Sequence, residues 1–494
     1  MAAELKPYSR YKDSGVEWLG EVPAHWAVER LKASTENVVD QSAGPGDKRT
    51  IVGLEHVESW TGRVTWRESD WSVEGQLKQF RSGDVLFGKL RPYLAKVTRL
   101  AADGLCVGEF LVLRPRQRHV NGAYLEHLLR SKPIIDAVNS STFGAKMPRA
   151  DWRFVGGMPV VCPPFPEQAT IVRFLDHADR RIRRYIRAKQ KLIALLEEQK
   201  QAIIFETATG RIDVRTGRPY PGYEDTDVKW LGAVPAHWEV MRVKQVSRVL
   251  RGAFTHRPRN DPSLYDGPYP FIQTGEVAGA DKRISSYRQT LNDRGLAVSR
   301  MFPAGTLVMA IAANIGDVAV LDFEACFPDS VVGFVPGDKI ERDFLYYVFR
   351  AMRPELLRKA PVNTQGNLNV DRVGSRRIPI PPHDEQRSVV RKIETNTVRL
   401  NAAIRQLECG VDLLREFRTR LVADVVTGKL DVREAAAGLS DLDLLATDED
   451  PNDDFNLYAR SEANGDAEEG GPGPDVVDAE RSDAAGGELI TEGG

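Results

Sequence analysis

Two long stretches of the chain have apolar residues at the spacing of an amphipathic helix. Between about residues 167 and 208, and again between about 385 and 426, apolar positions recur at steps of four and three, with Pro-Pro just before each stretch and Gly just after it. This pattern predicts two uninterrupted helices, each on the order of 60 Å long at about 1.5 Å per residue. Their seven-residue repeat predicts packing in a coiled coil.

The apolar stripe of each helix is the predicted seam. Each stripe could be buried against the domain that precedes it. A seam of this length is more simply buried along its whole length by the other helix, in an antiparallel pair. The same spacing also places Tyr185 and Leu192 in the first stripe. The residues predicted to form the seam are Leu175, Ile182, Leu196 and Ile203 in the first helix, and Ile393, Leu400, Leu407, Leu414 and Leu421 in the second.

Outside the helices, residues 33–162 and 245–380 contain short β-branched and aromatic runs bounded by Gly, Pro and Asp. Such runs are typical of strands, and short helices are expected where apolar residues take helical spacing. Each segment is therefore predicted to be a mixed, mainly β domain, which makes the fold class α+β. Examples of the predicted strands are 83–88, 110–115 and 306–311, and of the predicted short helices 123–129 and 342–349.

An internal duplication organises the chain. Residues 11–32 and 223–244 are identical at 14 of 22 positions, and Pro-Pro-x-x-Glu-Gln starts both long helices at an offset of 218. A third motif ends both helices, Thr-Gly-Arg-Ile-Asp-Val-Arg at 209–215 and Thr-Gly-Lys-Leu-Asp-Val-Arg at 427–433. Between these motifs the two halves differ. This is the pattern expected of a pseudo-twofold tandem repeat in which one scaffold holds two readers of different targets.

Composition and charge limit the classes of protein. The chain has 494 residues, 42% hydrophobic and 28% charged, as expected of a soluble protein with at least two domains. No stretch resembles a membrane span or signal peptide, and the four cysteines form no CxxC pair, so a cytoplasmic protein is expected. Residues 441–494 carry a net charge of −15, which leaves +13 on residues 1–440 because the whole chain carries −2. The basic body favours a nucleic-acid partner, with scattered solubilising charge as the alternative.

These patterns divide the chain into five predicted parts. The last part is acidic, rich in Gly and Ala and poor in apolar residues, so it is predicted to be disordered. The parts are a first domain at 1–165, a first central helix at 166–210, a second domain at 211–380 that begins with a linker at 211–227, a second central helix at 381–433, and the tail at 434–494.

The repeated motifs resemble those of the specificity subunits of Type I restriction-modification systems. The Trp-Leu-Gly-x-Val-Pro-Ala-His-Trp entry, the Pro-Pro-x-x-Glu-Gln helix starts and the Thr-Gly-(Arg/Lys)-(Ile/Leu)-Asp-Val-Arg ends carry the resemblance, which covers nearly all of residues 8–433. It implies two target-recognition domains, each of which reads one half of a bipartite DNA site, and two central helices that set the gap. The tail after Arg433 departs from this pattern and is assigned no role.

The resemblance also implies partners. Two copies of a DNA methyltransferase subunit would dock on the central helices, and a restriction subunit, which is a motor nuclease, can join. S-adenosylmethionine, ATP and Mg²⁺ are expected on those partner subunits, and no cofactor is expected on this chain. The chain itself is expected to be a non-catalytic reader that directs its partners to the site. Because its two domains differ, the site is expected to be asymmetric.

Candidate DNA contacts lie in loops rich in Lys, Arg and amide side chains, since Lys and Arg bind phosphates while Arg, Lys, Asn and Gln read base edges. For any single residue, a solvated surface charge or a loop-capping amide is the alternative, so the clusters carry the prediction. The candidates are Lys89, Arg91, Tyr93, Lys146 and Arg149 in the first domain, and Arg251, Thr255, His256, Arg257, Arg259, Gln273, Asn314, Asn363, Gln365 and Asn367 in the second.

The repeated tryptophans and histidines are predicted to be structural. Their identity in both copies indicates packing that both halves share, whereas readers of different sequences should differ. A stacking surface or a metal site is the alternative, but no histidine has the spacing of a metal motif, so no metal site is expected. The residues concerned are Trp18, His25 and Trp26 in the first copy and Trp230, His237 and Trp238 in the second.

Motifs of catalysis are missing from the sequence. The chain has no Gly-x-x-x-x-Gly-Lys-(Ser/Thr) phosphate loop and no Asn-Pro-Pro-Tyr-like segment. Asp227-Val-Lys229 resembles the end of a nuclease motif, but the first copy has Gly15-Val-Glu17 at that place. A non-catalytic DNA reader is therefore the preferred function. The alternatives are a methyltransferase or nuclease with an unrecognised motif, and a two-headed coiled-coil adaptor that does not bind DNA.

Overall fold

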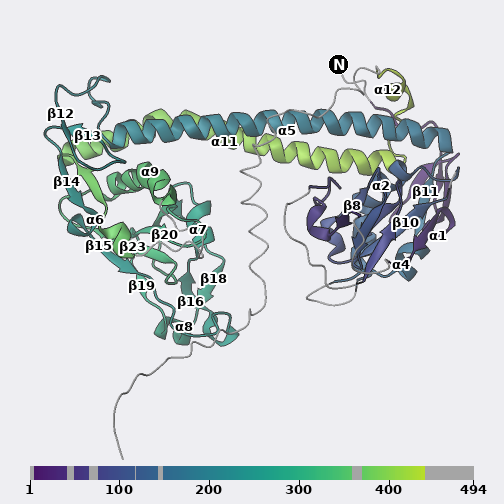
Figure 1. Cartoon of the computed structure of the whole chain (residues 1–494), viewed down its shortest axis with the longest axis horizontal. Helices are drawn as coiled ribbons and strands as arrows, with labels where there is room; N and C mark the ends of the chain where they lie inside the picture. Colours follow the sequence, from purple (N-terminus) through teal and green to yellow (C-terminus); the bar gives the residue numbers. More distant parts are fainter. Residues whose placement is uncertain are drawn as a thin grey trace, which may run out of the picture. The chain divides into compact units, whose positions relative to one another are not determined.

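The computed structural model describes residues 5–41, 49–65, 76–116, 118–142, 148–358 and 370–439. They form two compact units. Unit 1 comprises the described parts of Met1–Ile204 and Arg391–Asp448, and unit 2 comprises those of Phe205–Val390. Both units contain helices and β-sheets (Figure 1), so the predicted mixture of α and β structure is present.

Unit 1 is built on a four-stranded sheet, β4-β10-β7-β8, and a three-stranded sheet, β5-β9-β6, with two-stranded ladders β1-β2 and β11-β3. The strands are β1 (Tyr11–Asp13), β2 (Glu21–Pro23), β3 (Ala27–Arg30), β4 (Thr35–Val38), β5 (Ile51–Val52), β6 (Leu77–Phe80), β7 (Val85–Gly88), β8 (Val97–Arg99), β9 (Gly104–Val107), β10 (Phe110–Pro115) and β11 (Pro159–Cys162). The helices besides the two long ones are α1 (Leu31–Ser34), η1 (Leu54–His56), η2 (Pro92–Leu94), α2 (Gly122–Arg130), α3 (Lys132–Ser140), α4 (Trp152–Gly157) and α12 (Arg433–Ala437).

Both faces of the four-stranded sheet are buried. Along β10, Leu111 and Leu113 join the core that includes Tyr124 of α2, whereas Phe110 and Val112 join a second core with the smaller sheet. Side chains alternate between the two faces of a strand, so a continuous apolar run is what a strand covered on both sides requires. The Asn121 side chain accepts hydrogen bonds from the backbone at the start of α2, which fixes where that helix begins.

Unit 2 repeats this plan with a five-stranded sheet, β15-β23-β20-β21-β17, a four-stranded sheet, β18-β16-β22-β19, and the ladders β12-β13 and β14-β24. The strands are β12 (Tyr223–Asp225), β13 (Ala233–Pro235), β14 (Glu239–Arg242), β15 (Ser247–Arg251), β16 (Tyr265–Phe271), β17 (Arg283–Ile284), β18 (Gln289–Leu291), β19 (Met301–Phe302), β20 (Leu307–Ala310), β21 (Val318–Leu321), β22 (Ala325–Cys326), β23 (Val331–Pro336) and β24 (Arg377–Ile380). The short helices are α6 (Val243–Val246), η3 (Pro262–Leu264), α7 (Thr274–Gly279), α8 (Asp293–Ala297), α9 (Arg342–Arg358) and α10 (Val370–Gly374).

The two predicted long helices are α5 (Phe165–Ala208) and α11 (His383–Val426), each of 44 residues. They lie side by side in Figure 1, and two contacts within unit 1 give their direction. Arg418 of α11 lies 3.7 Å from Asp179 of α5, and a Cβ built on Gly410 would lie 3.0 Å from Lys189 Nζ. Residue numbers rise along one helix as they fall along the other, so these segments run antiparallel.

The predicted seam residues differ in burial. Leu175, Ile182, Ile393 and Leu421 are buried, while Leu196, Ile203, Leu400, Leu407 and Leu414 are half-buried. The placement of Tyr185 and Leu192 in the first stripe is wrong, because they are 54% and 45% exposed. After Ile182 the less exposed positions are one residue later than predicted: Ile186 replaces Tyr185, and Ile193 replaces Leu192. A helix with 3.6 residues per turn drifts in this way from a strict seven-residue repeat.

Two segments are more ordered than predicted. The expected linker at 211–227 is folded, since Tyr220 is buried and residues 223–225 form β12. The tail was predicted to be disordered from residue 434, but α12 covers the first residues of that range and buries Ala436. The Arg173 guanidinium of α5 also donates to the backbone oxygen of Leu439, 2.6 Å away. Residues 440–494 lie outside the described part of the chain.

Among the helices that the structure describes, none is both long and apolar enough to cross a membrane.

Candidate nucleic-acid interface

A buried carboxylate at the start of α5 holds the first repeated motif in place. Glu167 accepts hydrogen bonds from the Tyr8 hydroxyl at 2.8 Å and from Trp26 Nε1 at 3.2 Å, and its other oxygen lies 2.8 Å from His25 Nε2. Burial, together with the hydrogen bond to Glu167, raises the pKa of Tyr8 far above its ordinary value. The next residue, Gln168, is fully buried and ties α5 to the loop before α2 by a bond from Asn121 N at 2.7 Å.

Most of this arrangement recurs in unit 2, but Trp238 Nε1, the counterpart of Trp26 Nε1, is buried and has no hydrogen-bond partner among the described residues. Glu385, at the start of α11, accepts a hydrogen bond from the Tyr220 hydroxyl and lies 2.8 Å from His237 Nε2. Gln386 accepts from Glu341 N at 2.7 Å, as Gln168 does from Asn121. The prediction that the repeated His and Trp residues are structural therefore agrees with these contacts, except that Trp18 is partly exposed and lines a groove.

The Thr-Gly-x-x-Asp-Val-Arg motif after each long helix packs against the residues around the buried Glu at the start of the other long helix. After α11, Arg433 lies over the Tyr8 ring, with the guanidinium carbon 5.1 Å from its centre, and the Gly428 carbonyl accepts from the Tyr11 hydroxyl at 3.1 Å. After α5, the Gly210 carbonyl accepts from the Tyr223 hydroxyl at the same distance. Each unit thus contains one entry motif, one helix start and the end of the other helix.

Gly210 is expected to be intolerant of a side chain. Its φ is +74°, and an added Cβ would lie 2.6 Å from Pro235 and 2.8 Å from Trp238. We expect Gly210→Ala to lower the free energy of unfolding by about 2 kcal/mol or more, through left-handed strain plus overpacking. Gly217 is the matched control, because its φ is +71° with nothing within 4 Å. Equal losses in denaturant melts of the two variants would show that crowding at Gly210 adds nothing.

The first-domain candidates gather at the end of β7. Lys89 N donates to Glu109 O at 2.8 Å, Lys89 O accepts from Ala150 N at 2.9 Å, and Arg91 N donates to Pro148 O at 2.9 Å. These bonds bring Lys89, Arg91 and the exposed Tyr93 beside Arg149, which pairs with Glu109 at 3.0 Å. Arg91 adopts a left-handed φ of +50°, a conformation that side chains rarely take outside turns and functional loops. Lys146 lies outside the described residues.

Arginines form a comparable cluster in unit 2 after β15. Arg251 Nε donates to Asp329 O at 3.0 Å, and Arg259 Nη2 donates to the Asp329 carboxylate at 2.6 Å. Arg257, which is exposed, donates to the carbonyls of Phe254 and His256, both at 2.8 Å. The loop is thus fixed internally while its guanidinium groups remain at the surface. Such groups suit phosphate oxygens or guanine edges.

The remaining candidates of unit 2 are less clearly grouped. His256 Nε2 lies 3.1 Å from Asp261, and the Thr255 hydroxyl contacts Val298 O at 3.4 Å, so both side chains hold the arginine loop together. Asn314 Nδ2 contacts Thr274 O at 3.4 Å, which places it beside the exposed Gln273. Asn363, Gln365 and Asn367 lie outside the described residues.

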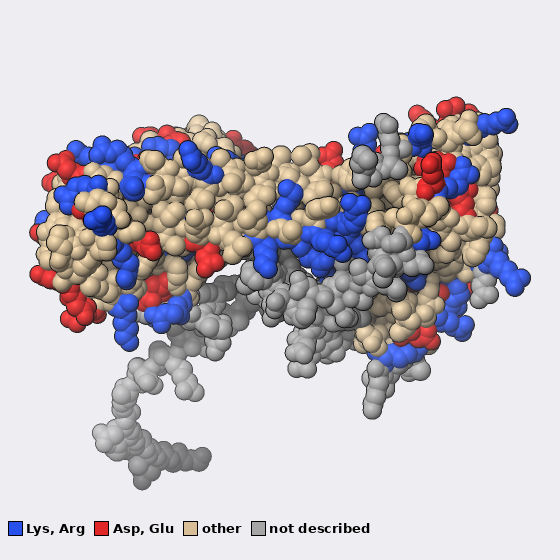
Figure 2. Space-filling model, turned by 90° about the horizontal axis from the view of Figure 1, so that it is seen from above, with Lys and Arg blue, Asp and Glu red and all other residues tan. Residues whose placement is uncertain are grey.

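Several basic residues near these clusters were not predicted as contacts. One of them is Lys78, which lies close to Lys89. Burial, and next the charge of Lys89, lower the pKa of Lys78 below its ordinary value. Arg300 is another, because it donates to Arg251 O at 3.4 Å. Residues 180–191 of α5 contain seven Lys or Arg and no acidic residue, and Figure 2 shows blue side chains gathered over the middle of the long helices. This charge run was visible in the sequence but was interpreted only as part of the seam.

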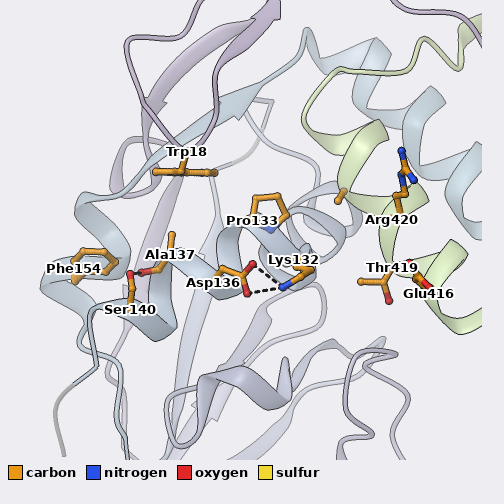
Figure 3. A pocket seen from close by; sticks show the side chains of 11 residues that line it. Trp18, Lys132, Pro133, Asp136, Ala137, Ser140, Phe154, Glu416, Thr419 and Arg420 are labelled. Atoms are coloured by element: carbon orange, nitrogen blue, oxygen red, sulfur yellow. Dashed lines mark hydrogen bonds and ion pairs between the residues drawn. The ribbon is translucent and has the colours of Figure 1, made fainter. Parts of the chain in front are cut away.

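A separate surface of unit 1 is apolar. A groove of about 800 Å³ lies between α3, α4 and α11, with Trp18 and Phe154 facing Thr419 and Arg420 across it (Figure 3). Its lining residues are Trp18, Lys132, Pro133, Asp136, Ala137, Ser140, Phe154, Glu416, Thr419, Arg420 and Ala423. The side chains of Leu413 and Phe417, on the same helix, are 60% and 53% exposed. Exposed apolar surface of this kind often marks a site of protein association.

Comparisons with known proteins show which proteins the chain is similar to. Residues 235–408 match the family model of the Type I restriction modification DNA specificity domain. The chain is 25% identical over 162 residues to the type I restriction enzyme EcoDI specificity subunit of Escherichia coli, a match that covers 32% of this chain and about a third, 36%, of that protein. It is 20% identical over 446 residues to a protein described as the MjaX specificity subunit of Methanocaldococcus jannaschii, with 84% and 96% of the two chains covered.

One solved structure has the same fold. It comes from work on complex assembly and conformational transition of the type I restriction-modification system, with a TM-score of 0.59 at 20% identity, and covers 83% of this chain and 99% of its own. The resemblance seen in the sequence motifs is thus confirmed: the chain is similar to the specificity subunits of type I restriction-modification systems. These relatives are named as specificity subunits, not as methyltransferases or nucleases, in agreement with a non-catalytic chain.

Proposed function

We propose that the chain is the DNA-reading specificity subunit of a type I restriction-modification complex. One observation carries the proposal: two units share the same arrangement around a buried Glu but present different loops rich in arginine. Glu167 and Glu385 each bind a Tyr hydroxyl and a His ring nitrogen. The basic loops, in contrast, lie at different places in the two sheets: the loop of Lys89 and Arg91 follows β7 in unit 1, whereas the arginine loop of unit 2 follows β15, which corresponds to β4. A shared scaffold with unlike readers is what recognition of an asymmetric, bipartite site requires.

In this proposal each domain docks on the major groove of one half-site. Phosphate contacts fix its position, and a few side chains select bases. The antiparallel helices α5 and α11 would separate the two target-recognition domains as a pseudo-twofold coiled coil. Because readers on one face of B-DNA prefer a spacing of about 10 base pairs from centre to centre, the site would be two short, unlike half-sites around a nonspecific gap. The basic run at 180–191 is suited to the phosphates of that gap.

The exposed apolar positions of the long helices support two methyltransferase partners. Leu195 of α5 and Leu413 of α11 occupy equivalent places, at the offset of 218, and are 52% and 60% exposed. The duplicated scaffold therefore offers two similar docking surfaces. A restriction subunit would join this assembly, and S-adenosylmethionine, ATP and Mg²⁺ would be bound by the partner subunits, which supply the chemistry.

Salt dependence of DNA binding tests the proposed function. The full chain, purified with its methyltransferase partner, is titrated with a fluorescent duplex at several salt concentrations. If at least four phosphates are contacted, the logarithm of the association constant should fall with a slope of about −4 or steeper against the logarithm of salt. Binding that is absent or insensitive to salt would favour the two-headed adaptor. Methyl transfer by this chain alone would favour an enzyme.

Charged substitutions on α11 are expected to disrupt partner docking. In the double variant Leu413→Asp and Phe417→Asp, the free chain should keep its melting temperature because both side chains are largely exposed. Co-purification of the methyltransferase should fall at least tenfold, since two buried apolar contacts of an interface would be lost. Glu408→Lys, at an exposed position of the same helix, is the control. Unchanged association of the double variant would place the docking surface elsewhere.

A further inference from the structure

Three residues of metal-ligand type meet in unit 1 from distant parts of the sequence. Glu29 lies on β3, His119 lies in the loop before α2, and Cys162 ends β11. His119 Nε2 is 2.7 Å from Glu29 Oε1, and one ligand atom from each of the three residues lies within 4.8 Å of the others. We propose that Glu29, His119 and Cys162 form a binding site for one divalent transition-metal ion of the zinc type.

The surrounding backbone holds these side chains on one surface. In the antiparallel ladder of β3 and β11, Ala27 is opposite Cys162, so Glu29, two residues farther along, projects from the same face as Cys162. His119 is fixed by its own carbonyl, which accepts from Gln168 Nε2 at 3.1 Å. The same amide lies 3.6 Å from Cys162 Sγ. The fully buried Gln168 therefore orients two of the three ligands from the start of α5.

The ligand chemistry selects the metal. A thiolate, an imidazole and a carboxylate are ligands of zinc and similar ions, whereas Mg²⁺ and Ca²⁺ prefer oxygen alone. Zinc bonds of about 2.0 to 2.3 Å require ligand atoms roughly 3.3 to 3.8 Å apart, with the nitrogen–oxygen pair at the short end of that range. The His119–Glu29 distance of 2.7 Å must therefore increase by about 0.6 Å. The His119 side chain is 49% exposed, which allows this movement and leaves room for a water ligand.

The second unit provides an internal comparison. Gln386 Nε2 donates to Lys339 O at 2.9 Å as Gln168 donates to His119 O, and Glu239 is opposite Ile380 as Ala27 is opposite Cys162. The positions of Glu29, His119 and Cys162 are thus held by Met241, Lys339 and Ile380. The Lys339 ammonium lies 3.7 Å from Met241 Sδ, and a cation there excludes a metal ion. The proposed site is therefore a property of unit 1 alone, with a stoichiometry of one ion per chain.

Cobalt titration of the reduced, chelator-treated full chain tests the site. We expect one Co²⁺ per chain, a thiolate-to-cobalt charge-transfer band in the near ultraviolet, and its loss when Zn²⁺ is added. Cys162→Ser should abolish the band. His119→Ala removes an exposed loop side chain, so it should leave the fold intact and weaken binding at least tenfold. Far-ultraviolet circular dichroism checks that both variants are folded.

Two thiols serve as controls. Cys409 is exposed and Cys106 is fully buried in the core, and Cys409→Ser and Cys106→Ser should each keep the band. A missing band in the parent chain overturns the proposal. So does a band that survives in both Cys162→Ser and His119→Ala, or that disappears in Cys409→Ser, because the ion would then be held by a surface thiol. None of these results depends on DNA binding.

Discussion

Glu167→Ala is expected to lower the free energy of unfolding by about 3 kcal/mol or more. The side chain is 8% exposed and joins Tyr8, His25 and Trp26 to the start of α5. Its removal leaves the Tyr8 hydroxyl and the Trp26 ring nitrogen without their acceptor in a buried place. Each buried donor that loses its acceptor typically costs about 1 to 3 kcal/mol. Urea unfolding of the full chain, followed by circular dichroism, measures the loss.

Two further variants test whether the loss of stability comes from the buried carboxylate or from any substitution in α5. Glu167→Gln keeps an acceptor oxygen and the same volume, so it should lose less, about 1 to 2 kcal/mol. Glu198→Ala, at an exposed position of α5, should lose almost nothing. If Glu167→Ala unfolds at the same urea concentration as Glu198→Ala, the repeated motif is not held by this carboxylate.

The double variant Arg257→Gln and Arg259→Gln is expected to weaken DNA binding at least tenfold. Both guanidinium groups are exposed in a loop that Asp329 and nearby carbonyls hold in place. Loss of an arginine contact to a phosphate or base typically costs about 1 kcal/mol or more. Lys229→Ala is the control, since this exposed lysine lies in the repeated turn after β12. An unchanged affinity would exclude the loop from the DNA interface.

The way in which DNA binding is weakened distinguishes two roles for these arginines. If both contact phosphates, the salt slope should fall by about two and the affinity should fall equally for all sequences. If one of them reads a base, discrimination at a single position of the half-site should be lost instead. The candidate pair in unit 1, Arg91 and Arg149, should affect only the other half-site.

The local pattern of apolar and polar residues predicted where helices and strands form, but not how their side chains pack. The apolar repeats at 167–208 and 385–426 predicted the bounds of α5 and α11 to within two residues, because a repeat between Pro-Pro and Gly is a strong local signal. The second central part at 381–433, in contrast, extends seven residues past the end of α11. The exposure of Tyr185 and Leu192 was missed, because a choice between steps of three and four after Ile182 depends on the partner helix. Periodicity alone does not contain that information.

Contacts between distant segments were also beyond local sequence reasoning. The repeat predicted that Trp26 and Trp238 are structural, but not that a glutamate about 140 residues later binds the first of them. Similarly, Glu29, His119 and Cys162 have no motif spacing, and only the pairing of β3 with β11 brings two of them together. The adjacency of two DNA-contact candidates, Lys89 and Arg149, follows from backbone bonds that the sequence does not specify.

The most direct test of the central claim is to exchange one reader and map the result. Residues 245–380 are replaced by the equivalent segment of another specificity subunit, and methylated bases are mapped genome-wide in a host that carries the chain with its methyltransferase. The account predicts that one half of a bipartite site changes, while the other half and the gap persist. Methylation that is unaffected by the exchange would contradict it, because the chain would then not choose the sequence.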